Sequence, residues 1–336
     1  MKVSNKSLGF TLIELMIAMV LGLILIGGVI QVFLSSKQTY ASQQALSEVQ
    51  ENARFALDMI AKDIRMAGYG GCSGDIKVAN TVEGASGAFS DFSNGLRGYE
   101  GGVDTFPTEL SATHVTTDAI VLHLIDANNE FTVDKHNANS AQIDLTAQHG
   151  MAAGTVMVIV DSNCSNMGIF MISNVSGGSG AASNAVHQTG KDFDGVQNCV
   201  KYLKGEFDCS VDPNSGDTGA TKDSYTPGSS VYAMSSLGYF IRDSGSDTTV
   251  PGLYRIASDL SSAEELVQGI EDLEIWYGVP SGSNLQFKKA GSVASTEWEL
   301  VSSVRIIVTS RSVEKYNGDY VRRSFTSTIQ IRNRGV

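Results

Sequence analysis

The chain has 336 residues, 42% of them hydrophobic, so it can bury the core of one or two domains. Its formal net charge of −12 argues against a protein that binds nucleic acid over most of its surface. Glycine is abundant and only five prolines occur, which favours polar loops on a β scaffold over a helix bundle.

The N-terminus is short and basic and leads into a long apolar segment. Lys2 and Lys6 precede Leu15–Leu34, which has no charged side chain and is long enough to cross a bilayer as a helix. No small-x-small cleavage site of a secretory signal peptide follows, so we expect the span to be retained. The positive charges before the span predict a cytoplasmic N-terminus and a periplasmic head.

A helical pattern continues beyond the membrane. We expect one helix over residues 10–67, about 85 Å long, which ends at the candidate C-cap Gly68. Residues 10–34 would be its membrane half, and a globular head over residues 68–336 would cover the apolar stripe of its second half. The stripe repeats at steps of three and four: Leu46, Val49, Ala53, Ala56, Ile60 and Ile64.

One carboxylate, Glu14, stands near the start of the apolar segment. A charged group in the hydrocarbon region is costly and usually has a partner. If the chain were cut after Gly9, the new α-amine of Phe10 would lie four residues from Glu14 and could pair with it, within one chain or between neighbours. The alternative is an ordinary anchor whose Glu14 lies among lipid headgroups. The residues alone leave both readings open.

Short β-branched runs predict a mainly antiparallel sheet, and hence an α+β fold with a long helix laid across it. We expect a hairpin around Ser244-Gly245-Ser246, a short helix over 261–270, and long polar loops over 68–110 and 176–230, with some short structure in the second. The expected strands are residues 119–126, 154–161, 168–175, 239–243, 253–257, 271–279, 299–310 and 324–333.

Four cysteines occur: Cys72, Cys164, Cys199 and Cys209. An even number outside the cytosol predicts two disulfides, and the sequence leaves the three pairings open. We expect Cys199–Cys209 to close a polar loop and Cys72–Cys164 to tie the helix exit to the sheet, each contributing about 2–4 kcal/mol. Free buried thiols would be expected only in a cytosolic head.

No pattern for catalysis or metal binding is found. The five histidines (His114, His123, His136, His149 and His187) are scattered without metal-ligand spacing, so we expect no enzyme, no metal and no cofactor. Residues 212–223 are similar to a calcium loop, but Gly216, Asp217 and Asp223 depart from its ligand pattern. A solvated turn cluster is the expectation, and calcium binding is the alternative.

The C-terminal segment 301–336 is basic in an acidic protein, with seven basic and two acidic residues. One reading is a polar strand face whose arginine heads lie in water. The other is a docking surface for an acidic partner, and this segment alone does not predict a nucleic-acid partner. The basic residues are Arg305, Arg311, Lys315, Arg322, Arg323, Arg332 and Arg334.

The N-terminal sequence KSLGFTLIELMIAMVL resembles the class III prepilin motif of type IV pilins and type II secretion pseudopilins. The resemblance implies a leader peptide over residues 1–9, removed between Gly9 and Phe10 by a prepilin peptidase. It also implies N-methylation of Phe10 by the same enzyme. Glu14 would then pair with the N-terminal amine of an adjacent subunit during assembly.

One feature departs from major pilins, which often carry a helix-bending proline in the membrane half. Here Gly22, Gly27 and Gly28 stand in that region instead. Each glycine weakens a helix by about 1 kcal/mol, so the helix could melt locally at Gly27-Gly28. Close packing of helices through small residues is the alternative.

Several later stretches, together with the chain length, resemble the PilW minor-pilin family, which is related to J-type pseudopilins. The resemblance implies a pilin-like fold and a minor pilin that joins a priming complex for type IV pilus assembly, at or near the pilus tip. It implies other minor pilins, the major pilin and a PilY-type tip adhesin as partners. The alternatives are a J-type pseudopilin of a type II secretion system and a membrane-anchored periplasmic enzyme. The stretches are ENARFALDMIAKDIRMAGYGGC, GYFIRD, GLYRIA, ELVQGIEDLEIWYGV, VSSVRIIVTSRS and IQIRNR.

Overall fold

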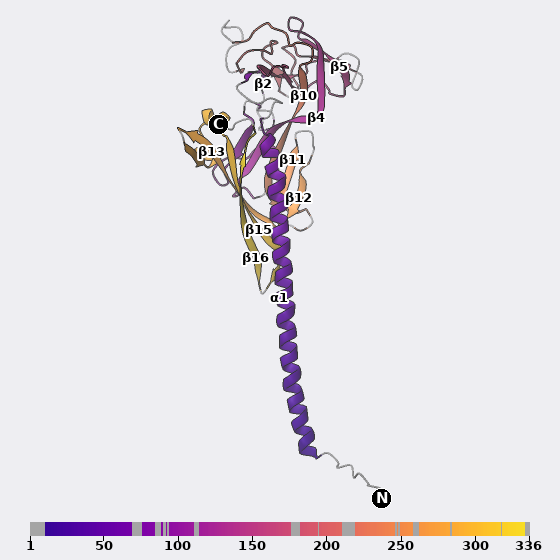
Figure 1. Cartoon of the computed structure of the whole chain (residues 1–336), viewed down its shortest axis with the longest axis vertical. Coiled ribbons are helices and arrows are strands. Elements are labelled where there is room, and N and C mark those ends of the chain that lie inside the picture. Colours follow the sequence, from indigo (N-terminus) through magenta and orange to yellow (C-terminus); the bar gives the residue numbers. More distant parts are fainter. Residues whose placement is uncertain are drawn as a thin grey trace.

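One long helix carries a β-rich head at its C-terminal end (Figure 1). The predicted sites Gly9, Phe10 and Cys72 lie outside the described residues. The computed structural model describes residues 11–68, 76–84, 89, 92, 94–110, 114–175, 182–193, 195–209, 219–245, 247, 249–257, 262–282, 284–316 and 318–332.

The helix α1 (Leu12–Met66) is continuous and matches the expected length. Thr11 caps its start, and the chain leaves it through Ala67 and Gly68, whose φ of 65° is the left-handed conformation that glycine adopts readily. The Gly68 amide donates to the His123 carbonyl at 2.9 Å, which fixes the exit against the head. The membrane-distal half buries one stripe: Ala45, Val49, Ala53, Ala56, Ile60, Ala61 and Ile64.

The larger sheet has ten strands, antiparallel except for the β1–β7 pair. Its strands are β1 (Lys77–Asn80), β3 (Leu96–Tyr99), β4 (Ala119–Asn137), β5 (Gln142–His149), β6 (Val156–Val160), β7 (Asn166–Met171), β8 (Ala182–Val186), β10 (Ser230–Asp243), β11 (Pro251–Ala257) and β12 (Glu264–Gln268). The main order is β1-β7-β6-β10-β4-β5-β8, with β3 paired to β4 and with β11 and β12 added beside β10.

A second, four-stranded antiparallel sheet lies against α1. It has the order β14-β13-β15-β16, built from β13 (Ile270–Ser281), β14 (Asn284–Lys288), β15 (Ser303–Tyr316) and β16 (Asp319–Gln330). The short elements are β2 (Val82–Glu83), which pairs with β9 (Gln197–Asn198), and the 3-10 helices η1 (Thr108–Leu110), η2 (Ala290–Ser292) and η3 (Ser295–Leu300).

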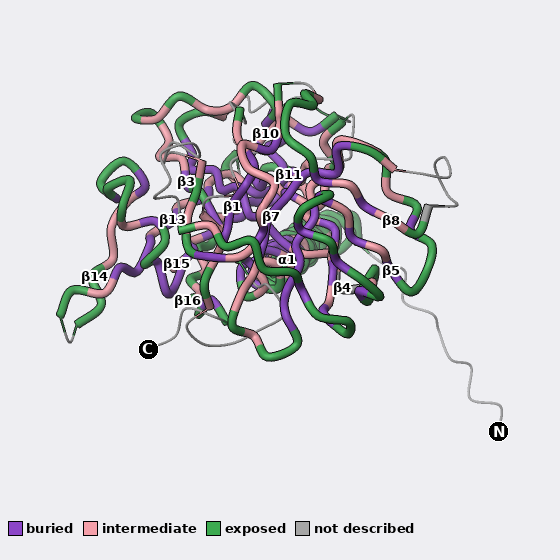
Figure 2. The backbone as a smooth tube through the Cα atoms, turned by 90° about the horizontal axis from the view of Figure 1, so that it is seen from above, coloured by how far each residue is buried: buried purple, intermediate pink, exposed green. Residues whose placement is uncertain are grey.

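The head has two parts, which we call the base and the distal lobe. The base is the core that packs on α1, and it includes Ile60, Ile275 and Ile306. The distal lobe contains two further cores, around Ile159 and Met171, and lies farther from the N-terminus (Figure 1). Seen from above, buried segments gather around the axis of α1 and exposed ones lie at the periphery (Figure 2). Because β4 and β10 are long, they run through both parts.

The expected strands are found, and the β10–β11 hairpin is confirmed by the pairing of Asp243 with Pro251. The expected helix over 261–270 is wrong, because Glu264–Gln268 forms strand β12. Its side chains find partners across β11: Arg255 donates to Glu264 at 2.9 Å, and Tyr254 donates to Glu265 at 3.1 Å. The expected loop over 68–110 is also wrong in part, since it contains β1, β2 and β3.

Candidate functional site: the uncovered half of the helix

The membrane-proximal half of α1 presents apolar side chains on all sides. Leu12 is 80% exposed and Leu25 is 69% exposed, and none of the described residues before Ala45 is buried. It contains the one segment of the described chain that is long and apolar enough to cross a membrane. An apolar surface of this extent does not remain in water, so lipid or other helices must cover it.

Glu14 lies at the capped start of this helix. Its carboxylate Oε2 accepts hydrogen bonds from the Thr11 amide at 3.0 Å and the Thr11 hydroxyl at 2.9 Å. In return, the Glu14 amide donates to Thr11 Oγ1 at 3.3 Å, which completes a capping box. The carboxylate therefore points back toward the N-terminal end of the chain, where the positive end of the helix dipole favours it.

This geometry brings Glu14 close to the predicted processing site. The Glu14 carboxylate already accepts a hydrogen bond from the Thr11 amide. Thr11 directly follows Phe10, so an amine on Phe10 would lie only one residue away from that amide. The cut at Gly9 and the methylation of Phe10 stay predictions, because both residues lie outside the described chain. Sequence reasoning missed the role of Thr11, although the spacing T-x-x-E is the signature of a capping box.

The glycines of the apolar half have no packing role against the described part of the chain. A Cβ added at Gly22, Gly27 or Gly28 would meet no heavy atom within 4 Å, and α1 runs through all three without a break. Local melting and close packing against neighbouring helices therefore both stay predictions.

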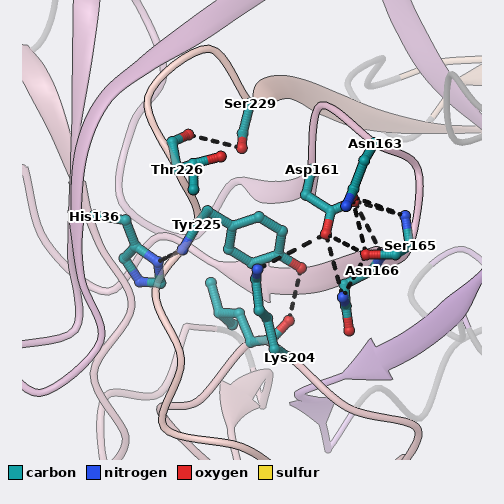
Figure 3. Close-up of polar contacts among 10 residues, drawn as sticks. His136, Asp161, Asn163, Ser165, Asn166, Lys204, Tyr225, Thr226 and Ser229 are labelled. Atoms are coloured by element: carbon teal, nitrogen blue, oxygen red, sulfur yellow. Dashed lines mark hydrogen bonds and ion pairs between the residues drawn. The ribbon is translucent and has the colours of Figure 1, made fainter.

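A polar cluster lies in the distal lobe (Figure 3). Asp161 accepts four hydrogen bonds from the amides and side chains of Ser165 and Asn166, at 2.7 to 3.2 Å. Burial raises the pKa of Asp161, but these hydrogen bonds together lower it below its ordinary value. The Lys204 ammonium lies 3.7 Å from Asp161 and 4.6 Å from the centre of the Tyr225 ring.

Two histidines that are 51 residues apart in the sequence meet beside this cluster. The Tyr225 amide donates to His136 Nδ1 at 2.9 Å, and His136 Nε2 faces His187 Nε2 at 3.2 Å. The proton of His136 must therefore be on Nε2 and be donated to His187. Burial, with a smaller contribution from the charge of Lys204, lowers the pKa of His136 to about 4. Burial also lowers the pKa of His187 well below its ordinary value.

The other histidines have separate partners. His114 Nε2 lies 2.7 Å from Asp243, His123 Nδ1 lies 2.7 Å from the Ser236 hydroxyl, and His149 Nε2 donates to the Asn184 carbonyl. The polar groups of Figure 3 are engaged with one another, as when Tyr225 donates its hydroxyl proton to the Leu203 carbonyl at 2.8 Å. This arrangement stabilises a loop-rich lobe.

The predicted disulfide between Cys199 and Cys209 is confirmed. Cys164 is also disulfide-bonded. Its predicted pairing with Cys72 stays a prediction, because Cys72 lies outside the described residues. Glu83 lies close enough to Cys199 and Cys209 for the three residues to share a metal ion. The sulfurs of the two cysteines are, however, joined to each other in the disulfide. Part of the calcium-like stretch 212–223 also lies outside the described residues, so that alternative stays untested.

Three arginines of the basic C-terminal segment are engaged within the head. Arg311 is buried and donates to the Thr249 carbonyl, and the Arg305 guanidinium lies 3.9 Å from the centre of the Phe287 ring. Arg322 forms an ion pair with Glu271 at 2.6 Å. These contacts favour the reading of a polar strand face over that of a basic docking surface.

Two protein-family models match the chain. The prokaryotic N-terminal methylation motif matches residues 4–30, and type IV pilus-assembly protein W (PilW) matches residues 238–319. No curated protein and no solved structure matches. The PilW match covers β11 to β15 and the second half of β10, which are largely base strands. Together the two matches support a type IV minor pilin of the PilW type, and a structural protein.

Proposed function

We propose that this PilW-type minor pilin joins other minor pilins in a short complex that primes polymerisation of a type IV pilus, and then lies at or near the pilus tip. The observation that carries the proposal is the uncovered apolar half of α1, residues 12–34, in a chain whose residues 4–30 match a methylation motif. Such a helix is built to leave one apolar environment, the inner membrane, for another made of neighbouring helices.

Processing would prepare the helix for assembly. A prepilin peptidase would cut between Gly9 and Phe10 and methylate the new amine of Phe10. That amine would be attracted to Glu14, whose carboxylate already faces the N-terminal end of the chain. Pairing with Glu14 of an adjacent subunit would satisfy a charge in an apolar environment and fix the axial step between subunits.

The shape of the head supports a place at the end of the filament. The distal lobe lies at the far end of the head from the N-terminus (Figure 1). In a helical stack the next subunit is displaced along the filament axis, so a lobe in that position would obstruct a subunit above it. The partners would be other minor pilins, the major pilin below, and a PilY-type adhesin at the tip. Before assembly, the head would be periplasmic.

The first experiment deletes the gene and measures sheared surface pili and a secreted exoprotein in the same strain. We expect the pili to be lost and secretion to remain. Loss of secretion with intact pili would instead assign the chain to a secretion pseudopilus, as a J-type pseudopilin.

Complementation then tests Glu14. We expect Glu14→Ala to be inserted and processed but to restore few or no pili, because the carboxylate has no substitute in the apolar segment. Glu48→Ala, which removes an exposed carboxylate from the distal half of the same helix, should restore pili as the wild type does. Normal piliation by Glu14→Ala would contradict the proposed role, and the mass of the mature N-terminal peptide reports processing and methylation.

A further inference from the structure

Strand β16 is an open edge of the four-stranded sheet. It pairs with β15 on one side, and on its other side the described part of the chain places no strand. An edge strand presents a row of unpaired backbone donors and acceptors to any chain that can adopt an extended conformation. β16 is also long, with 12 residues, whereas β14 at the opposite edge has five.

Half of this edge lacks the features that usually block strand addition. Those features are charged side chains, proline, β-bulges and short length. The segment Ser324–Gln330 has no charge and no proline, and the register irregularity lies at the hairpin end, between Arg311 and Lys315 of β15. Thr326 and Thr328 are exposed in this segment. The edge is therefore open to an added strand.

A groove of about 400 Å³ runs beside this segment, between it and α1. Leu57 of α1 and Phe325 of β16 are half-buried there, at the margin of the base core. Side chains alternate between the two faces of a strand, so an added strand would direct every second side chain into this groove. The lining is Gln50, Arg54, Leu57, Asp58, Phe325, Thr326 and Ser327.

The groove lining carries one positive and one negative side chain, Arg54 and Asp58, and Arg323 adds a positive charge beside the groove. Arg54 lines it, and Arg323 is exposed two residues before Phe325 on the same face of β16. Within the described residues neither arginine forms an ion pair, and the Arg323 guanidinium donates to the Arg322 carbonyl at 3.4 Å. Asp58 is the one carboxylate of the lining. A ligand strand with an acidic side chain facing the groove would complement this surface.

We propose that the β16 edge receives an extended strand from the head of a different pilin subunit, which places an apolar and an acidic side chain in the groove. This inference rests on the proposed function, because it needs a neighbour beside α1. The groove opens along residues 50–58 of the same helix whose uncovered residues 12–34 would contact neighbouring helices. A second copy of this chain that added its own β14 edge to β16 would be a poor occupant of the site. Its five-residue β14 would pair with less than half of the 12 residues of β16.

The test is site-specific photo-crosslinking in cells that assemble pili, with the full chain in its membrane. A photoreactive residue at Thr328 is compared with one at Gln286, an exposed position on the opposite edge strand β14. We expect Thr328 to give an adduct whose mass identifies another pilin, and Gln286 to give none of that mass. An adduct with lipid or with a second copy of this chain, or no adduct, would overturn the proposal.

Substitutions at the edge give the second readout. Thr326→Lys should abolish the Thr328 adduct and reduce surface pili, while Gln286→Lys changes neither. Arg54→Glu should weaken the adduct, and Lys62→Glu, which reverses an exposed charge elsewhere on α1, should not.

The amount of chain in the membrane and its Cys199–Cys209 disulfide report folding. If deletion of the gene removes pili but Thr326→Lys leaves pili and adduct unchanged, the inference fails and the proposed function stands. If deletion leaves pili intact, the proposed function fails.

Discussion

His136 and His187 make the distal lobe sensitive to acid. Each is held in a neutral, buried state, and the pKa of His136 is lowered to about 4 against an ordinary value near 6.5. The unfolded chain therefore binds more protons than the folded one between these two values. The stability that the neutral histidines confer is complete above about pH 6.5 and is lost as the pH falls toward 4.

We expect the free energy of unfolding of the full chain in detergent to fall by about 3 kcal/mol over this range through His136 alone. In His136→Asn the side-chain oxygen can still accept from the Tyr225 amide, but the group that titrates is gone. Urea unfolding at several pH values should show a smaller slope for His136→Asn than for the wild type. Parallel curves for the two proteins between pH 6.5 and 5 would contradict this assignment.

At the scale of elements, the small side chains of α1 set how closely it approaches the second sheet. Ala45, Ala53, Ala56 and Ala61 are buried on the stripe that packs on the base. Interiors are packed as densely as organic crystals, so little space remains for extra atoms at these positions. This is why the distal half of α1 lies flat on the head, while the proximal half, rich in Leu, Ile and Met, extends away from it (Figure 1).

Enlarging one of these alanines should therefore destabilise the base. We expect Ala53→Leu to lower the free energy of unfolding by about 1–3 kcal/mol, because the added methyl groups force the helix from the sheet. Glu51→Leu introduces the same side chain at an exposed position of the same turn and should leave the unfolding midpoint almost unchanged. Equal effects of the two substitutions in thermal unfolding would show that the contact is loosely packed.

At the scale of the whole molecule, the base and the distal lobe depend on different stabilising devices. The base has the largest core and the contact with α1. The distal lobe has smaller cores, long connections and the disulfide between Cys199 and Cys209. A disulfide stabilises mainly by limiting the unfolded ensemble, by about 3 kcal/mol for a loop of this size.

Removing this disulfide should affect the lobe selectively. In the full chain carrying Cys199→Ser and Cys209→Ser, we expect trypsin to cleave faster after Lys201 and Lys204, which lie within the opened loop. Cleavage after Arg305 in the base should keep its wild-type rate. A uniform increase at all sites would mean that the head unfolds as a single unit, and unchanged rates would mean that the bridge adds little.

Local patterns of the sequence determined the helix, its amphipathic second half, the main strands and the position of Glu14 at the start of the apolar segment. Each of these depends on neighbours within a few residues along the chain. A period of 3.6 places Val49, Ala53, Ala56 and Ile60 on one face whatever they pack against. Short β-branched runs likewise identify the cores of β13 and β15. The Cys199–Cys209 bridge could be predicted for the same reason, since it closes a short loop.

Long-range contacts decided the rest. Glu264–Gln268 has helix-forming residues, yet it is a strand because β11 supplies backbone partners and Arg255 and Tyr254 bind its carboxylates. His136 meets His187, and Asp161 meets Lys204, only because the fold brings distant segments of the chain together. No periodicity marks β16 as an edge strand either, because that position depends on which strands the rest of the chain leaves unpaired.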